Sequence, residues 1–230
     1  MVRSHILYLI LLLNFPSFQL MAQSAPFACW STILLNLRVK TKWTSITDIG
    51  FRSVSRDIIP YQHFFRSGLR YNLDPNWNIT SGIAFFSTKT SFLKENHEYG
   101  HEFRLWTDFS RLSLRTRKFI MNHRVRIERR FFDATSTRLS FNSFRFQYRL
   151  LSGVQFNSKF NFQTGPEIFE SLIRQKFSLD QIRWYSILGI LPGKGYGISL
   201  GYFFVYRKAY DQNIFAITLS KNLQLYEHHH

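Results

Sequence analysis

Charged side chains recur at every second position in part of this chain, a spacing that suits ion pairing or anion binding. Two sets alternate between residues 121 and 128, the apolar Met121, Val125 and Ile127 and the polar Asn122, Arg124, Arg126 and Glu128. Successive side chains of a β-strand point to opposite faces, so this strand would have one apolar and one charged face. Arginine and glutamate on one face can pair with each other, and arginine in excess can bind anions.

The same alternation extends this charged set over much of the chain, and we predict that it lines the interior of a β-barrel. Its members are Asp48, Arg52, Glu102, Arg104, Asp108, Arg124, Arg126, Glu128, Arg130, Arg145, Arg149, Glu167 and Arg183. Charges in a narrow interior must pair, because an unpaired buried ion costs several kcal/mol. The set is therefore a structural network that fills the lumen or, because its arginines outnumber its acids, the lining of a narrow anion-preferring pore.

Histidine and serine offer a second chemistry, on the opposite face. His101 and His123 share the phase of the apolar residues of their segments, and Ser143 is expected on the outer face of the next strand. A serine beside a histidine can form a nucleophile–base pair, which makes an outer-membrane lipid-modifying enzyme an alternative function. No catalytic motif surrounds these residues, so no catalytic residue is assigned.

No metal site and no cofactor are predicted. His97 and His101 have the spacing of one helical turn, but the segment is extended. At roughly 3.3 Å per residue their side chains would lie about 13 Å apart, too far to share an ion.

Eleven segments of alternating polarity must position these residues. They are approximately Trp30–Val39, Trp43–Val54, Tyr61–Tyr71, Trp77–Thr88, Tyr99–Phe109, Lys118–Phe131, Arg138–Leu150, Ser158–Gly165, Leu179–Ile190, Tyr196–Arg207 and Asn213–Leu225. Their length suits tilted strands that cross an outer membrane, and none has a helical period. The predicted fold class is all-β, a single antiparallel transmembrane β-barrel.

Bacterial barrels of this kind have an even number of strands, so eleven segments imply a missed strand, in Ser110–Thr116, or one segment split in two. We therefore expect about 10–12 strands. Tight turns are expected at Lys40–Lys42, Asp74–Asn76 and Pro192–Gly195. Longer, polar loops are expected at Ser55–Pro60, Leu93–Glu98, Asp133–Thr137 and Phe169–Ser178.

An aromatic residue follows each tight turn directly, namely Trp43, Trp77 and Tyr196. Aromatic rings favour the membrane–water boundary, where one edge can be wet. These three residues predict an aromatic girdle at one rim. Aromatic residues that simply begin strands of a soluble sheet are the alternative explanation.

The first residues predict export. A positive charge at Arg3, an apolar run from Ile6 to Leu13 and a small residue at Ala22 form the layout of a signal peptide cleaved after Ala22. The expected domains are a signal peptide over residues 1–22, an outer-membrane barrel over 23–226 and a tail over 227–230. The final histidines resemble the remnant of a purification tag.

The formal net charge of +16 would suit nucleic acid, but the signal peptide and the lack of any nucleic-acid motif argue against that partner. The basic residues alternate with apolar ones, so outer-membrane lipid and lipopolysaccharide are the expected partners. Cys29 is the only cysteine, and no internal disulfide can form.

A soluble secreted barrel of the lipocalin type would show the same alternation turned inside out. Two features favour the membrane. One set is bulky and apolar along whole segments, as in Ile33, Leu35 and Leu37. The opposite set mixes Arg, Asn, Gln, Ser and Gly with few acids, which suits a wet lumen better than an exposed sheet surface.

Several short motifs resemble a known family. They are Glu102–Trp106, Asn122–Phe131, Tyr148–Leu150, Pro166–Phe169 and Gln181–Tyr185. Their order and spacing resemble an uncharacterised family of Gram-negative outer-membrane β-barrel proteins, a domain of unknown function about as long as the part of this chain that follows the predicted signal peptide. The resemblance implies a barrel in the outer membrane, and it brings no substrate or catalytic residue. Many such barrels end on an aromatic in phase with the last strand, whereas Tyr226 is out of phase with Leu223 and Leu225.

Overall fold

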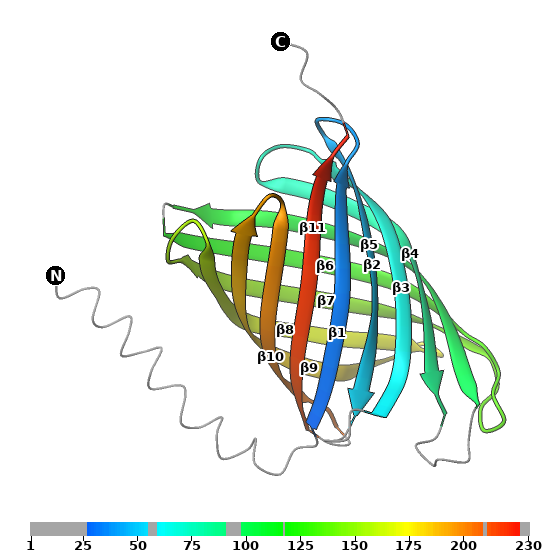
Figure 1. Cartoon of the computed structure of the whole chain (residues 1–230). Helices are drawn as coiled ribbons and strands as arrows, with labels where there is room; N and C mark the ends of the chain where they lie inside the picture. Colours follow the sequence, from blue (N-terminus) through cyan, green and yellow to red (C-terminus); the bar gives the residue numbers. More distant parts are fainter. Residues whose placement is uncertain (1–26, 55–58, 91–97, 117, 209–210, 226–230) are drawn as a thin grey trace.

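The computed structural model describes residues 27–54, 59–90, 98–116, 118–208 and 211–225. Every regular element in these ranges is a β-strand, as predicted, and eleven strands close into one barrel (Figure 1). The strands are β1 (Phe27–Arg38), β2 (Trp43–Val54), β3 (Ile59–Asn72), β4 (Trp77–Lys89), β5 (Tyr99–Arg115), β6 (Phe119–Phe132), β7 (Phe141–Gln155), β8 (Phe160–Ile173), β9 (Lys176–Gly193), β10 (Tyr196–Tyr206) and β11 (Gln212–Gln224). The predicted signal peptide and tail lie outside the described residues.

The barrel closes between its first and last strands. Each strand pairs antiparallel with the next along the chain, and β1 then pairs with β11. This closing pair is parallel, in register from Phe27 opposite Asn213 to Arg38 opposite Gln224. In a meander with an odd number of strands, the first and last strands run in the same direction. The expectations of an even strand number and of a wholly antiparallel barrel are therefore wrong.

Two sequence-based boundaries also change. The segment Ser110–Thr116 forms no extra strand, because β5 continues through it to Arg115. The predicted loop Phe169–Ser178 is wrong, since β8 and β9 run through it and meet at Arg174 and Gln175. Both turn residues have positive φ, 48° and 64°. A hairpin turn of this kind usually contains Asn or Gly, so the sequence carried no turn signal.

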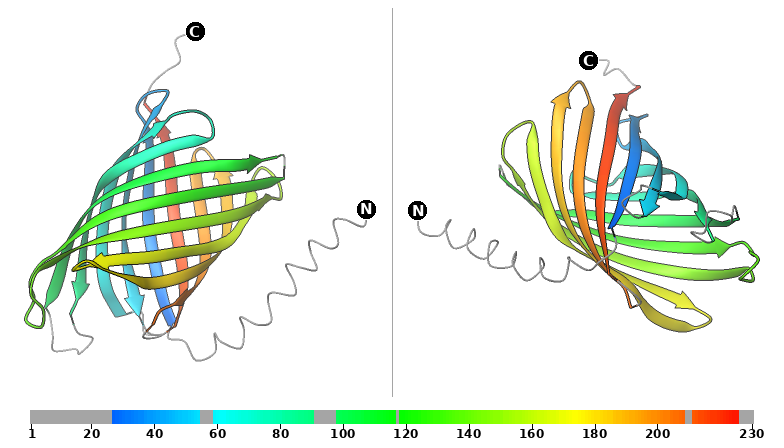
Figure 2. Two further views of the ribbon diagram at one scale, coloured as in Figure 1. Left: turned by 180° about the vertical axis from the view of Figure 1, so that it is seen from behind. Right: turned by 60° about the horizontal axis from the view of Figure 1, so that its bottom comes forward.

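The connections between strands divide between two ends of the barrel. Those joining β1 to β2, β3 to β4, β5 to β6, β7 to β8 and β9 to β10 lie at one end, here called the short-turn end. The other connections lie at the long-loop end. Strands β6, β7 and β8 are steeply inclined to β1 and β11 on the opposite wall (Figures 1 and 2). Such tilt and twist are what closing a sheet into a barrel requires.

The interior has two differently filled sides. An apolar side is formed mainly by β1, β10 and β11, with Ala28, Trp30, Phe203, Val205 and Ile214 at its centre. An ionic side is formed by β5, β6, β7 and β8, whose charged residues are described below. Large apolar side chains cover the outside of the barrel, where Ile33 is 61% and Phe85 50% exposed.

Candidate functional site

The structure places the charged set inside the closed barrel. Most of its members are buried, namely Asp48, Glu102, Arg104, Asp108, Arg126, Glu128, Arg145 and Glu167. The others, Arg52, Arg124, Arg130, Arg149 and Arg183, are half-buried. Residues of the opposite phase, such as Val125 and Ile127, are exposed on the outer surface.

Glu128 on β6 is the centre of the ionic side. Its Oε2 lies 2.7 Å from Nη2 of Arg145 on β7 and 3.4 Å from Nη1 of Arg104 on β5. Its Oε1 lies 3.7 Å from Nη1 of Arg126. Three arginines therefore share one carboxylate, which is buried, because only 2% of Glu128 is exposed. Removing that carboxylate would leave the three buried guanidinium groups with less negative charge to compensate them.

A second line of contacts runs from β5 to β9. Asp108 accepts a hydrogen bond from Nε of Arg126 at 2.5 Å and lies 3.8 Å from Nη1 of Arg124. Arg124 donates to Glu167 on β8 at 2.5 Å, and the Tyr185 hydroxyl on β9 donates to the same carboxylate. Together with the contacts of Glu128, these bonds link every strand from β5 to β9 through interior side chains.

Two further carboxylates complete pairs elsewhere in the interior. Glu102 contacts Nε of Arg104 at 2.6 Å and Nε of Arg130 at 2.5 Å. Asp48 on β2 pairs with Arg66 on β3 through two of its guanidinium nitrogens. Arg66 was not among the predicted interior residues, although it alternates with exposed apolar residues in the same way as the predicted arginines.

Three of the predicted interior arginines, Arg52, Arg149 and Arg183, have no carboxylate within ion-pair distance in the described ranges. Arg52 lies 4.1 Å above the ring of Trp30 and donates to the Gln62 side chain at 2.7 Å. Arg183 lies 4.4 Å from the ring centroid of Phe169. Contacts with aromatic faces stabilise a cation without neutralising it. The interior therefore keeps an excess of positive charge.

The short-turn end carries a ring of aromatic side chains. Every strand that begins there starts with one, namely Trp43, Trp77, Phe119, Phe160 and Tyr196, and all are exposed. Phe119 and Phe160 were not predicted, because the expected segments begin one or two residues before these strands do. We call these five residues the aromatic rim.

Basic side chains accompany the aromatic rim. The connections at the short-turn end contain Lys40, Lys42, Lys118, Lys159 and Lys194, against a single described acid, Asp74. Lys221 Nζ lies 3.4 Å from the ring centroid of Tyr196, and the guanidinium of Arg111 lies 5.0 Å from that of Trp77. This end therefore combines exposed rings with positive charge.

A hydrogen-bonded serine, histidine and tyrosine lie on the outer wall below the aromatic rim. Ser113 Oγ lies 2.8 Å from His123 Nε2, and the Tyr148 hydroxyl lies 2.8 Å from Nδ1 of the same ring. Ser113 is the extra residue of a β-bulge, where the pairing of β5 with β6 shifts between Leu112 and Leu114. A bulge redirects a side chain, so strict alternation cannot predict where Ser113 points.

The predicted placement of Ser143 on the outer face is wrong. Ser143 is 2% exposed and shares the inward phase of Arg145 and Gln147 on β7. The strand begins at Phe141, and its pairing with β6 continues without a shift. His101 is exposed on the outer wall at the opposite end of β5 from Ser113.

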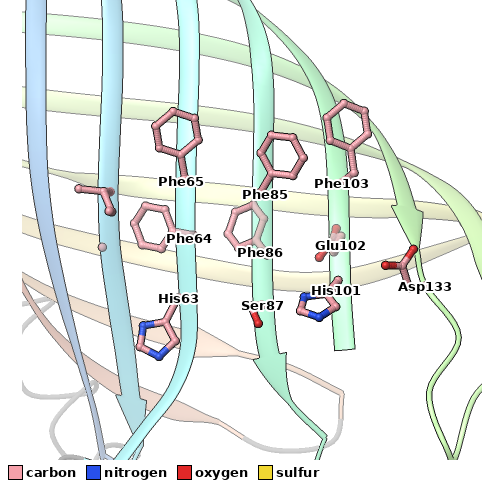
Figure 3. A pocket seen from close by; sticks show the side chains of 12 residues that line it. His63, Phe64, Phe65, Phe85, Phe86, Ser87, His101, Glu102, Phe103 and Asp133 are labelled. Carbon is pink, nitrogen blue, oxygen red and sulfur yellow. The ribbon is translucent and has the colours of Figure 1, made fainter. Parts of the chain in front are cut away.

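A pocket of about 500 Å³ opens in the wall formed by β2, β3, β4 and β5 near the long-loop end (Figure 3). The exposed apolar residues of its lining are Ile49, Phe65 and Phe85, and Phe103 beside them is half-buried. Next to these rings, Ser87 stands directly between His63 and His101 on the neighbouring strands. Among the described residues, neither histidine forms a hydrogen bond with the Ser87 hydroxyl. The wall beside the pocket therefore brings a serine and two histidines together, the same residue types as on the outer wall below the aromatic rim, but the described side chains are not hydrogen-bonded to one another.

Within the described ranges, no group of three or more His, Cys, Asp or Glu side chains is arranged to hold a metal ion. His97 lies outside those ranges. The described part of the chain also contains no helix of the length and apolarity needed to cross a membrane.

The fold and interior define a closed β-barrel with a charged core. Residues 27–214 match the family described as "Protein of unknown function (DUF2490)". The chain therefore belongs to this family, which confirms the predicted resemblance to an uncharacterised domain. No match was found among curated proteins or among solved structures.

Proposed function

We propose that the protein is an integral outer-membrane β-barrel whose interior is closed by its own ion pairs. It would act as a rigid scaffold in the membrane and not as an open channel. The strands have from 11 residues in β10 to 18 in β9, enough to cross a bilayer when tilted. Apolar side chains cover the outside, and buried charges occupy one side of the inside, an arrangement unlike that of a soluble barrel.

The aromatic rim supports the same proposal. Exposed tryptophan, tyrosine and phenylalanine rings at one level of a barrel suit the boundary between acyl chains and head groups. The lysines of the adjacent turns would then face anionic lipid, including lipopolysaccharide, and attract it by charge. The purified protein should therefore need detergent to stay in solution and should migrate differently before and after heating. A protein that remains monomeric in buffer alone would refute membrane insertion.

The burial of the ionic side is the observation that carries the proposal of a closed interior. Arg126 is 7%, Glu128 2% and Glu167 1% exposed to solvent. Side chains that line an open channel would be accessible, because solvent would fill the lumen. A cavity of about 370 Å³ at the long-loop end is lined in part by Glu102 and Arg130 of the ionic side, whereas Arg126, Glu128 and Glu167 do not line it.

Conductance across planar bilayers tests this closure. We expect no stepwise current from the wild-type barrel. The double variant Glu128→Ser with Arg145→Ser should conduct or leak, because it shortens both members of the central ion pair. Stable channel openings in the wild type would refute the closed interior.

An anion-preferring pore is the second candidate, and Arg52, Arg149 and Arg183 favour it, because they have no carboxylate partner among the described residues. If the wild type conducts, the reversal potential in a salt gradient identifies the selected ion. A pore of this kind should select chloride over potassium, and Arg149→Gln should weaken that preference. Cation preference would exclude this candidate as well.

A further inference from the structure

We infer that Ser113, His123 and Tyr148 form a hydrolytic site for acyl esters of membrane lipids on the outer wall of the barrel. The inference rests on the proposed lipid-facing outer surface. It adds an activity to a barrel whose interior is closed, and it is independent of whether the interior conducts ions.

The three side chains have the order of hydrogen bonds that nucleophilic catalysis requires. The Tyr148 hydroxyl can accept a hydrogen bond from Nδ1–H of His123, and in that tautomer Nε2 is unprotonated. That nitrogen, 2.8 Å from Ser113 Oγ, can accept the serine proton. Ser113 itself is exposed, so a substrate can approach its oxygen. Tyr148 acts as a positioning residue, because its hydroxyl is hydrogen-bonded to the histidine ring and acts on the serine through it.

The site lies at a suitable depth for a lipid ester. His123 is four residues beyond Phe119 of the aromatic rim, which is roughly 13 Å along a tilted strand at about 3.3 Å per residue. Ser113 is two residues from the end of β5. If the rim marks the membrane boundary, the serine lies near the junction of head groups and acyl chains, where ester bonds are located.

The surroundings fit a phospholipid with an anionic head group. Arg111 is directly opposite His123 in the pairing of β5 with β6 and is exposed, so its guanidinium can bind a phosphate. Leu114 and Val125 are exposed apolar neighbours on the same face and offer a surface for acyl chains. The lysines of the short-turn end add positive charge nearby.

The reaction would proceed in two balanced steps. Ser113 Oγ attacks the ester carbonyl carbon while His123 Nε2 takes the serine proton; the ester C–O bond then breaks, and His123 returns the proton to the leaving alcohol. Water next attacks the acyl-serine with His123 as base. The acyl–serine bond breaks, the proton returns to Ser113 and a free fatty acid leaves. The net reaction is ester plus water to acid plus lysolipid.

The test uses the full-length protein folded in detergent, with the heat-induced change in mobility as the check of folding. Fatty acid release is measured from vesicles of phosphatidylethanolamine and phosphatidylglycerol. We expect Ser113→Ala and His123→Ala to lower release at least about 100-fold, as loss of a nucleophile or general base does. Ser87→Ala is the matched control, because this outer-wall serine also lies between histidines but is not hydrogen-bonded to them. It should retain wild-type activity.

Two further measurements distinguish catalysis from a structural role. A fluorophosphonate should label the folded wild type and Ser87→Ala once per chain, by displacement of fluoride, and should not label Ser113→Ala. Tyr148→Phe should fold normally, lower the rate about 10-fold and shift its pH profile, because the histidine loses its orienting partner. A folded wild type that neither releases fatty acid nor reacts with fluorophosphonate overturns the inference, as does activity that depends on Ser87. Neither outcome affects the closed-interior proposal, which conductance tests separately.

Discussion

The ionic and apolar sides of the interior fill the same barrel by opposite means. On the apolar side, Val205 and Ile214 are fully buried and pack against other hydrocarbon groups. On the ionic side, Glu128 is almost as deeply buried but is surrounded by guanidinium groups. The two sides meet at Trp30, which packs with the apolar cluster while Arg52 and Arg183 lie over its ring.

This difference shows how each side depends on its neighbours. An apolar residue gains stability roughly in proportion to the area it removes from water, so shortening it loses only part of that gain. A buried carboxylate has already lost its hydration, and it is stable only because its partners remain. Single substitutions should therefore be more damaging on the ionic side, whereas paired substitutions should be tolerated there.

The largest effect is expected for Glu128→Gln. The substitution keeps the shape of the side chain but leaves three buried arginines without their shared negative charge. We expect a loss of about 3–5 kcal/mol in the free energy of unfolding, the usual result of breaking a buried ion pair. Urea unfolding of the barrel in lipid vesicles, followed by tryptophan fluorescence, measures this change.

The matched control removes charge from both partners. The double variant Glu128→Leu with Arg145→Met removes both charges of the shortest ion pair of Glu128, so neither member is left without the other. Buried pairs can often be replaced by apolar groups at little cost. We expect the double variant to be more stable than Glu128→Gln. A double variant that is less stable than either single variant would contradict the comparison, because it would mean that the pair itself stabilises the barrel.

Strict alternation explains what the sequence could predict. Arg126 and Glu128 belong to one face of β6 because side chains alternate with a period of two, and no knowledge of other strands is needed. The partner of each arginine depends on the register between strands, so the pair of Asp48 with Arg66 could not be foreseen. Ser113 escaped prediction because one inserted residue changes the phase. The parallel closure of β1 on β11 joins the first and last strands of the chain, so alternation within a single strand could not predict it.

A smaller effect is expected on the apolar side for Ile214→Val. The substitution removes one methylene group from a fully buried side chain without exposing any polar atom. We expect a loss of about 0.5–1.5 kcal/mol. The same urea titration measures it, and the loss should be unchanged at high salt. A loss as large as that of Glu128→Gln would mean that the two sides do not differ in the way the burial and the ion pairs indicate.

The smallest effect is expected for Glu98, a glutamate outside the interior. Hydrogen bonds donated by the Ser136 hydroxyl and backbone N–H hold the pKa of Glu98 below its ordinary value of 4.5. Because the folded pKa is lowered, the stabilisation is present above the ordinary value and is lost as the pH falls through the folded pKa. Glu98→Gln should therefore be slightly less stable than the wild type at pH 7, and this difference should shrink in acid. The difference between the two unfolding midpoints, measured from neutral to acid pH, cancels the titration of all other carboxyl groups. A difference that stays constant over this range would show that the carboxylate charge of Glu98 is not what joins the two loops.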